Sequence, residues 1–236
     1  MTHRTRLIAA LDTKDRQQAL SWADDVGRIV DALKLGMEFT YSCGFEAVQE
    51  VSSGHSLFLD LKLHDIPNTV ASGLSALASL RPALTTIHAS GGSEMIARGR
   101  ETLEKAILPG ETRPKLLAVT VLTSMNAEGL AETGVDAPPR EQVLRLGKLA
   151  MQAGADGLVC SAHEIAPLRD ALGDDPILVV PGIRPAGASA NDQKRIMTPA
   201  QAARAGADWI VVGRPIIRAE NPARAAQAIM DELASA

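Results

Sequence analysis

Charged side chains are concentrated in the segment Leu59–Thr69, which reads Leu-Asp-Leu-Lys-Leu-His-Asp-Ile-Pro-Asn-Thr. The segment continues an apolar strand into a loop. Because side chains on a strand alternate between two faces, we expect Phe58, Asp60 and Lys62 on one face and the leucines on the other. Buried charges are tolerated only when they are paired and hydrogen-bonded. The pattern therefore indicates either a structural ion pair or a reactive site.

Eight short β-rich segments alternate with helical segments along the chain. The predicted strands are Leu7–Leu11, Ala32–Leu35, Leu57–Leu63, Thr85–His88, Leu116–Leu122, Gly157–Cys160, Ile177–Val180 and Trp209–Val212. The predicted helices include Asp15–Val26, Phe45–Val51, Asn68–Ser79, Ser93–Ala106, Arg140–Ala153, Glu164–Leu172 and Pro199–Ala205. Strands that alternate with helices indicate βαβ units and a parallel sheet. Eight units in 236 residues predict one α/β domain over residues 1–236, a TIM (β/α)8 barrel.

An internal repeat supports this fold. Residues 152–159 and 204–211 share the pattern Ala-Gly-Ala-Asp followed by apolar residues. In each copy we expect a helix to end at the glycine, which tolerates a left-handed cap, and a strand to follow at once. We see no linker or low-complexity stretch.

Composition excludes several classes of protein. The formal net charge is −4 and aromatic residues make up 3% of the chain, so a basic, aromatic nucleic-acid surface is not expected. No apolar run is long enough to span a membrane, and the N-terminus has no signal-peptide pattern. The two cysteines, Cys43 and Cys160, lack metal-ligand spacing and are interpreted as reduced thiols in or near the core. These features predict a cytoplasmic protein without membrane or nucleic-acid partners.

Polar residues stand where most of the predicted strands end. They are Asp12, Lys34, Asp60, Lys62, Asp65, His88, Thr123, Ser124, Arg184 and Arg214. In a TIM barrel the carboxyl ends of all strands meet at one mouth, which holds the active site. The sequence therefore predicts that these groups converge.

A phosphate site is predicted at the last two strands, whose following loops often hold phosphate in this fold. Gly213 lets the backbone approach an anion, and Arg214 beside it offers a guanidinium that binds phosphate through two hydrogen bonds. Arg184 and Gln193 stand at the two ends of a loop rich in Gly, Pro, Ala and Ser, and we expect them to clamp the same phosphate. A loop of this length is typical of a lid.

These motifs together resemble the orotidine 5′-phosphate decarboxylase family. The matching motifs, in chain order, are Leu11-Asp12, Lys34-x-Gly36, Asp60-x-Lys62-x-x-Asp65-Ile66-Pro67-x-Thr69, His88-Ala89-x-Gly91-Gly92, Val119-Thr120-x-Leu122-Thr123-Ser124, Pro181-Gly182-Ile183-Arg184 and Val212-Gly213-Arg214-Pro215. Related hexulose-phosphate synthases and ketogulonate-phosphate decarboxylases share the Asp-x-Lys-x-x-Asp core. The continuation over residues 64–69 resembles the orotidylate branch.

The resemblance implies decarboxylation of orotidine 5′-monophosphate to UMP and CO2, the last step of de novo UMP synthesis, without cofactor or metal. Loss of CO2 leaves a C6 carbanion with no electron sink, so the site must stabilise negative charge and supply a proton. The resemblance makes Lys62 the acid, in a charged row with Lys34, Asp60 and Asp65.

The family resemblance also implies a homodimer in which Asp65 and Thr69 reach the partner's site. By the same resemblance, Asp12 and Lys34 contact the ribose hydroxyls, Asp60 lies near the substrate carboxylate, and Thr123 and Ser124 contact the pyrimidine. His64 is expected to be structural. His88 is expected to support the mouth through a hydrogen bond.

Three alternatives remain at the level of sequence. The first is a Mg²⁺-dependent enzyme of the same superfamily that acts on a keto sugar phosphate. The second is a non-catalytic barrel that binds a phosphosugar or nucleotide, which predicts a broken charged row. The third is an indole- or phosphoribosyl-type barrel enzyme, which would share only the phosphate end.

Overall fold

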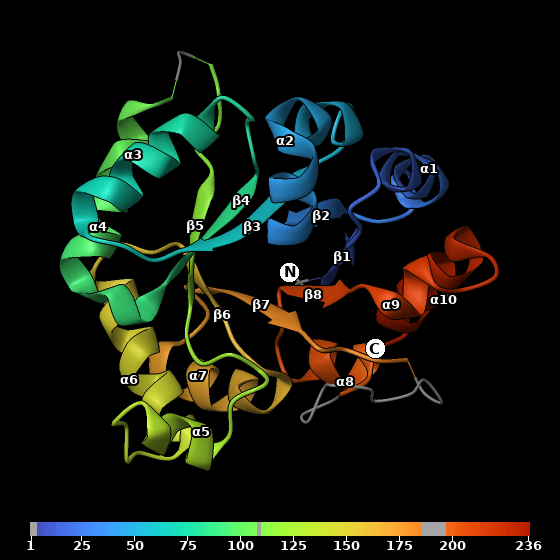
Figure 1. Ribbon diagram of the computed structural model, residues 1–236. Helices are drawn as coiled ribbons and strands as arrows, with labels where there is room; N and C mark the ends of the chain where they lie inside the picture. Colours follow the sequence, from blue (N-terminus) through green and yellow to red (C-terminus); the bar gives the residue numbers. More distant parts are fainter. Residues whose placement is uncertain (1–3, 108–109, 186–196) are drawn as a thin grey trace.

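The computed structural model describes residues 4–107, 110–185 and 197–236, and its strands close into one parallel barrel (Figure 1). Neighbouring strands pair in chain order, and the eighth pairs with the first. The strands are β1 Arg6–Ala10, β2 Ala32–Gly36, β3 Leu57–Leu63, β4 Leu84–His88, β5 Lys115–Val119, β6 Gly157–Val159, β7 Ile177–Pro181 and β8 Trp209–Val212. The predicted TIM barrel is confirmed.

Helices surround the barrel on the outside (Figure 1). They are α1 Arg16–Val26, α2 Met37–Val51, α3 Pro67–Ala78, α4 Gly92–Lys105, α5 Ala127–Glu132, α6 Pro139–Gln152, α7 Ile165–Leu172, α8 Pro199–Arg204, α9 Arg214–Ile217 and α10 Pro222–Ala234. Short 3₁₀ turns, Ala89–Gly91 and Ala162–Glu164, precede α4 and α7. Among the residues described, no helix has the length and apolar character needed to cross a membrane.

Several predicted boundaries differ from the structure. The element α2 begins at Met37, but Gly44, with a non-helical φ of 79° and ψ of 175°, breaks it into two helical parts, and the second part matches the helix predicted over Phe45–Val51. The fifth strand ends at Val119, not Leu122, because the chain bends after Thr120, whose N–H still reaches the Val159 carbonyl.

Two apolar layers hold the barrel together. The interior column consists of residues from every strand: Ile8, Ala10, Ala32, Phe58, Leu84, Leu117, Val119, Val159, Val179, Trp209 and Val211. The larger layer lies between strands and helices and includes Leu57, Leu59 and Leu61. The predicted division of β3 between an inner Phe58 and outer leucines is confirmed.

The end of β3 departs from a regular strand. Leu59 pairs with Thr85 and Leu63 pairs with Ile87, so an advance of four residues along β3 corresponds to an advance of only two residues along β4. Within this bulge Lys62 has φ of 50°, an uncommon value for a residue other than glycine. Bulges of this kind redirect a side chain, and the redirected side chain here is the candidate acid.

The two copies of the internal repeat form equivalent helix–strand connections at the amino end of the barrel. Gly154 and Gly206 have φ of 95° and 98°, as the left-handed cap predicts. The carbonyl of Gly154 accepts from Arg100, and that of Gly206 accepts from Arg169. The aspartate two residues later, Asp156 or Asp208, pairs with the same arginine.

Candidate active site

The predicted polar residues converge at the carboxyl end of the strands. A cavity of about 160 Å³ lies there, and its lining includes Lys34, Phe58, Asp60, Lys62, Val119, Val121, Leu122, Thr123, Val159, Cys160, Val179, Pro181 and Val211. Its floor is the upper part of the interior apolar column. A concave pocket with mostly apolar walls and a few charged groups at one side is typical of a site for a small organic ligand.

Asp60 is the centre of the charged cluster. Its carboxylate is buried, with the Lys62 ammonium 2.7 Å from Oδ2 and the Lys34 ammonium 3.8 Å from the same oxygen. Lys34 also lies 3.0 Å from Oδ1 of Asp12, whose side chain is half exposed. The structure therefore joins four of the predicted residues into one row, Asp12–Lys34–Asp60–Lys62.

The row keeps its charges in spite of burial. Burial alone would lower the pKa of Lys34, but the carboxylates of Asp60 and Asp12 outweigh it and raise that pKa above its ordinary value. Burial alone would raise the pKa of Asp60, but Lys34 and Lys62 and the hydrogen bonds from Lys62 and Thr86 hold it below its ordinary value. At neutral pH Asp60 is therefore ionised and Lys34 is protonated.

Thr86 is a site residue that the sequence reasoning missed. Its hydroxyl donates to Oδ1 of Asp60 at 2.9 Å and accepts the backbone N–H of Lys62 at 2.9 Å. Its side chain is fully buried on β4. One hydroxyl thus fixes both the carboxylate and the unusual backbone of the candidate acid. A polar pair, Thr85-Thr86, in an otherwise apolar strand was the available signal.

Two glycines leave room for the row. A Cβ on Gly36 would lie 3.0 Å from the Lys34 ammonium, and one on Gly213 would lie 3.7 Å from Oδ2 of Asp12. A side chain at Gly36 would therefore press on the Lys34–Asp12 pair. Gly213 places the β8 end beside the β1 end, so Asp12 and the predicted phosphate site are neighbours.

The predicted phosphate residues lie at the last two strands. Arg214 is the first residue of α9 and is half-buried, and Gly213 caps that short helix. Arg184 is buried, and its backbone N–H donates to the carbonyl of Met197 at 3.0 Å, so residues 184 and 197 are in contact. Gln193 lies outside the described residues, and its predicted role as a clamp stays a prediction.

Other predicted residues lie at the rim. Asp65 is exposed and its carboxylate accepts its neighbour's N–H, from Ile66, without an ion pair to Lys62 in the described part of this chain. Thr69 is also exposed, on the first turn of α3. Thr123 lines the cavity, whereas the adjacent Ser124 is exposed in the loop after β5.

The two histidines form a contact beside the row. The ring centroids of His64 and His88 are 5.4 Å apart. Burial lowers the pKa of His88, and neighbouring His64 and Lys62 lower it further, so His88 is neutral at pH 7. A neutral ring adds no positive charge next to Lys62, in keeping with the supporting role expected for His88.

The sequence also led us to expect a site without cofactor or metal. Over the described ranges, no three His, Cys, Asp or Glu side chains come together as metal ligands would. The expectation itself stays a prediction. Cys160 is buried in the cavity lining, and Cys43 is half-buried.

A (β/α)8 barrel with a lysine–carboxylate row at its carboxyl mouth defines the chain as an enzyme of the TIM-barrel class. Residues 5–229 match the model of the orotidine 5′-phosphate decarboxylase / HUMPS family. The chain belongs to this family.

Named relatives cover the whole length. The orotidine 5′-phosphate decarboxylase of Gluconobacter oxydans (strain 621H) is 75% identical over 236 residues, all of both chains. That of Citrifermentans bemidjiense is 46% identical over 229 residues, 97% of this chain and 95% of the relative. The crystal structure of orotidine 5′-phosphate decarboxylase from Lactobacillus acidophilus superposes with a TM-score of 0.86 at 42% identity, covering 98% and 99% of the two chains.

Proposed function

We propose that this chain decarboxylates orotidine 5′-monophosphate to UMP and CO2, the last step of de novo UMP synthesis. The observation that carries the proposal is the buried Asp60 carboxylate held between the ammonium groups of Lys34 and Lys62. Full-length relatives at up to 75% identity bear the name of this activity.

The proposed chemistry needs charge stabilisation and one proton. The bond between C6 and the carboxylate breaks, CO2 leaves, and the electron pair stays on C6. Lys62 stabilises this developing charge and then gives its proton to C6, after which the amine recovers a proton from water. A lysine paired at 2.7 Å with a buried aspartate is held in place for that transfer. By family resemblance, Asp60 lies near the departing carboxylate.

The remaining substrate groups are assigned to the rest of the mouth. We assign the ribose hydroxyls to Asp12 and Lys34, and the pyrimidine edge to Thr123 and Ser124, whose hydroxyls both donate and accept. The phosphate is assigned to Gly213, Arg214, Arg184 and Gln193. Binding energy at the remote phosphate then orders the charged row for catalysis.

A homodimer would complete the site. Met37 and Tyr41, one turn apart on α2, are 43% and 71% exposed, and Ile66, next to Asp65, is 67% exposed. Exposed large apolar side chains after the neighbouring strands β2 and β3 favour a protein interface. We propose that a second copy covers this face and that Asp65 and Thr69 enter its partner's site.

Hybrid dimers test the shared site. Asp65→Ala and Lys62→Ala chains should each be inactive alone, and mixing should restore activity because one of the two hybrid sites carries neither change. A confirmed heterodimer without activity would contradict the role of Asp65 across the interface.

Metal-free turnover tests the reaction itself. Purified protein in EDTA should convert orotidine 5′-monophosphate to UMP, measured by loss of orotidylate absorbance and by chromatography. Turnover of a keto sugar phosphate that requires Mg²⁺, with no loss of orotidylate, would favour the other branch of the family. A cytoplasmic location, expected from the sequence, belongs to the same proposal.

A further inference from the structure

A second and larger cavity lies at the amino end of the barrel, opposite the site described above. Its volume is about 500 Å³, against about 160 Å³ at the carboxyl end. Volumes of this order hold small organic ligands. Its floor is the lower end of the interior apolar column, including Leu84, Ile177 and Trp209, the first residues of β4, β7 and β8.

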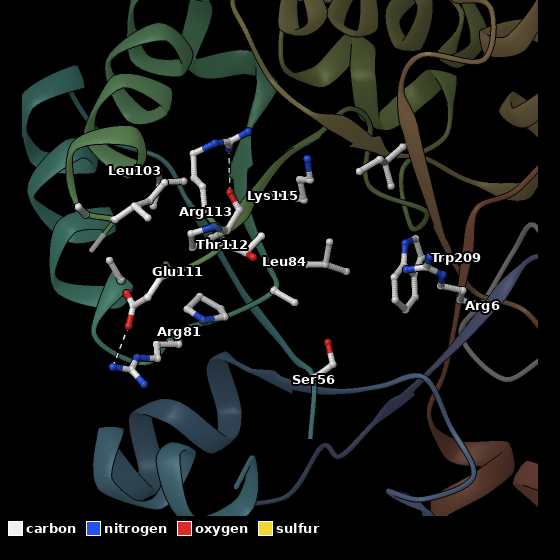
Figure 2. Close-up of a pocket in the computed structure, with 17 residues that line it drawn as sticks. Arg6, Ser56, Arg81, Leu84, Leu103, Glu111, Thr112, Arg113, Lys115 and Trp209 are labelled. Carbon is white, nitrogen blue, oxygen red and sulfur yellow. Dashed lines mark hydrogen bonds and ion pairs between the residues drawn. The ribbon is translucent and has the colours of Figure 1, made fainter. Parts of the chain in front are cut away.

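Cations dominate the polar lining of this cavity, which includes Arg6, Arg81, Arg113 and Lys115 with one carboxylate, Glu111 (Figure 2). Two of these cations already have a carboxylate partner within the protein. Arg81 pairs with Glu111 at 2.8 Å, and Arg113 forms two hydrogen bonds of 2.6 and 2.7 Å with Asp156.

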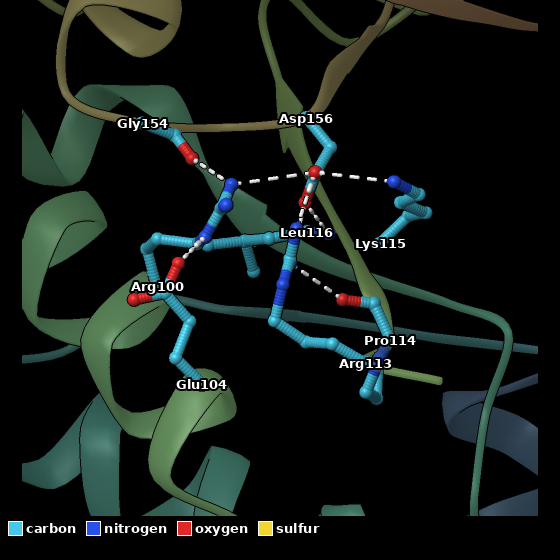
Figure 3. Close-up of polar contacts among 8 residues, drawn as sticks. All are labelled: Arg100, Glu104, Arg113, Pro114, Lys115, Leu116, Gly154 and Asp156. Carbon is cyan, nitrogen blue, oxygen red and sulfur yellow. Dashed lines mark hydrogen bonds and ion pairs between the residues drawn. The ribbon is translucent and has the colours of Figure 1, made fainter. Parts of the chain in front are cut away.

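The positive charge of Lys115 is only partly compensated by a carboxylate. Asp156, its nearest carboxylate at 3.7 Å, also accepts from Arg113, Arg100 and the backbone N–H of Leu116 (Figure 3). One carboxylate therefore faces three cations. The Lys115 side chain belongs to the cavity lining and is 46% exposed.

Arg6 supplies the second uncompensated charge. Its guanidinium lies over the Trp209 ring, 5.0 Å from the centroid, and forms no ion pair among the residues described (Figure 2). Contact with an indole face holds a guanidinium in place without neutralising it. Arg6 and Lys115 begin β1 and β5, which stand across the barrel from each other.

We propose that this cavity binds a flat organic anion with negative groups at both ends. Its ring would rest on the apolar floor of Leu84 and Trp209, and its anionic groups would face Arg6 and Lys115. Charge-assisted contacts to a guanidinium and an ammonium are strong in a pocket with apolar walls. The ligand class follows from this arrangement of two cations around an apolar centre.

The probe is naphthalene-2,6-dicarboxylate, and its neutral control is the diol of the same shape, 2,6-bis(hydroxymethyl)naphthalene. The chain has two tryptophans, so Trp22→Phe leaves Trp209 as the only one and makes its fluorescence report on this cavity. Titration of that variant with the dicarboxylate should quench the fluorescence saturably, with a Kd at least tenfold lower than the Kd of the diol.

Substitutions test whether the dicarboxylate binds in this cavity. Lys115→Ala and Arg6→Ala, each checked for folding by circular dichroism and turnover, should each weaken the dicarboxylate about tenfold, which is typical of losing one charge-assisted contact. Lys105→Ala, which removes an exposed cation of α4 outside the cavity, should leave it unchanged. Arg214→Ala should also leave it unchanged, because that residue lies at the other end.

Several results would overturn the proposal. They are equal binding of the diol and the dicarboxylate, unchanged affinity in both Lys115→Ala and Arg6→Ala, or absence of saturable quenching. Loss of binding in Arg214→Ala would also overturn it, since that would assign the anion to the catalytic mouth.

Discussion

Replacing Thr86 by valine removes one hydroxyl while keeping the size and shape of a fully buried side chain. The change leaves Oδ1 of Asp60 without its donor and the N–H of Lys62 without its acceptor. A hydrogen bond to a charged group contributes about 1.5–3 kcal/mol, and an orphaned buried N–H costs about 1–3 kcal/mol. We therefore expect a loss of about 3 kcal/mol in the free energy of unfolding, or roughly 6–12 °C in Tm.

The effect on catalysis has a distinct signature. A displacement of about 1 Å in a reacting group costs up to roughly 100-fold, so kcat should fall about 10- to 100-fold in Thr86→Val. KM should change little, because the proposed phosphate contacts lie at β7 and β8. The hydroxyl also lowers the pKa of Asp60, so its loss should move the acid limb of the kcat profile to higher pH.

The assay is orotidylate absorbance as a function of pH, alongside thermal unfolding. Thr86→Ser restores the hydroxyl and should recover kcat and the acid limb, even if its smaller side chain lowers Tm. The reasoning is refuted if Thr86→Val keeps kcat within about twofold of wild type, or if its acid limb does not move.

Three further substitutions test the proposed phosphate site, the helix–strand connections at the amino end of the barrel and the packing of β6 on β7. Arg214→Ala should lower kcat/KM roughly 30- to 150-fold in steady-state assays, which corresponds to a loss of about 2–3 kcal/mol in transition-state stabilisation. An unchanged value would contradict the phosphate assignment. Burial would raise the pKa of Asp156, but the hydrogen bonds from Arg113 and Leu116 hold it below its ordinary value, so its stabilising effect is present above about pH 4 and lost as pH falls through the lowered pKa. Asp156→Asn should therefore cost about 3 kcal/mol in denaturant unfolding at pH 7 and less at pH 3, and an equal cost at both would refute this. Gly157→Ala would drive a Cβ into the Ile177 backbone, so soluble expression or Tm should drop sharply, and a wild-type Tm would contradict the packing of β6 on β7.

The order of the elements was accessible from the sequence because each strand is a short apolar run between glycines and helical segments. The bounds of β3 and β8 were predicted as observed. The C-terminal helix α10 and short α5 were absent from the predicted helices. The hydrophobic periodicity of a short or partly polar helix is too weak to predict where the helix begins and ends. Those ends are determined by the capping residues and by packing in the folded chain.

The site was predictable as a set of residues but not as a geometry. Asp60 and Lys62 were expected to meet because a strand alternates, yet Lys62 sits in a bulge with positive φ and reaches Asp60 from there. Which threonine of β4 faces the row depends on the register across that bulge, and the regular alternation of β3 did not predict a bulge. Thr86 was missed for this reason.

The most direct test of the central claim compares wild type with Lys62→Ala. Both proteins are assayed for loss of orotidylate absorbance in EDTA, and binding of UMP is measured to show that the mouth still forms. The account predicts rapid conversion by wild type and a loss of several orders of magnitude in kcat for Lys62→Ala, with UMP still bound. A Lys62→Ala protein that retains wild-type kcat would contradict the assignment of Lys62 as the acid.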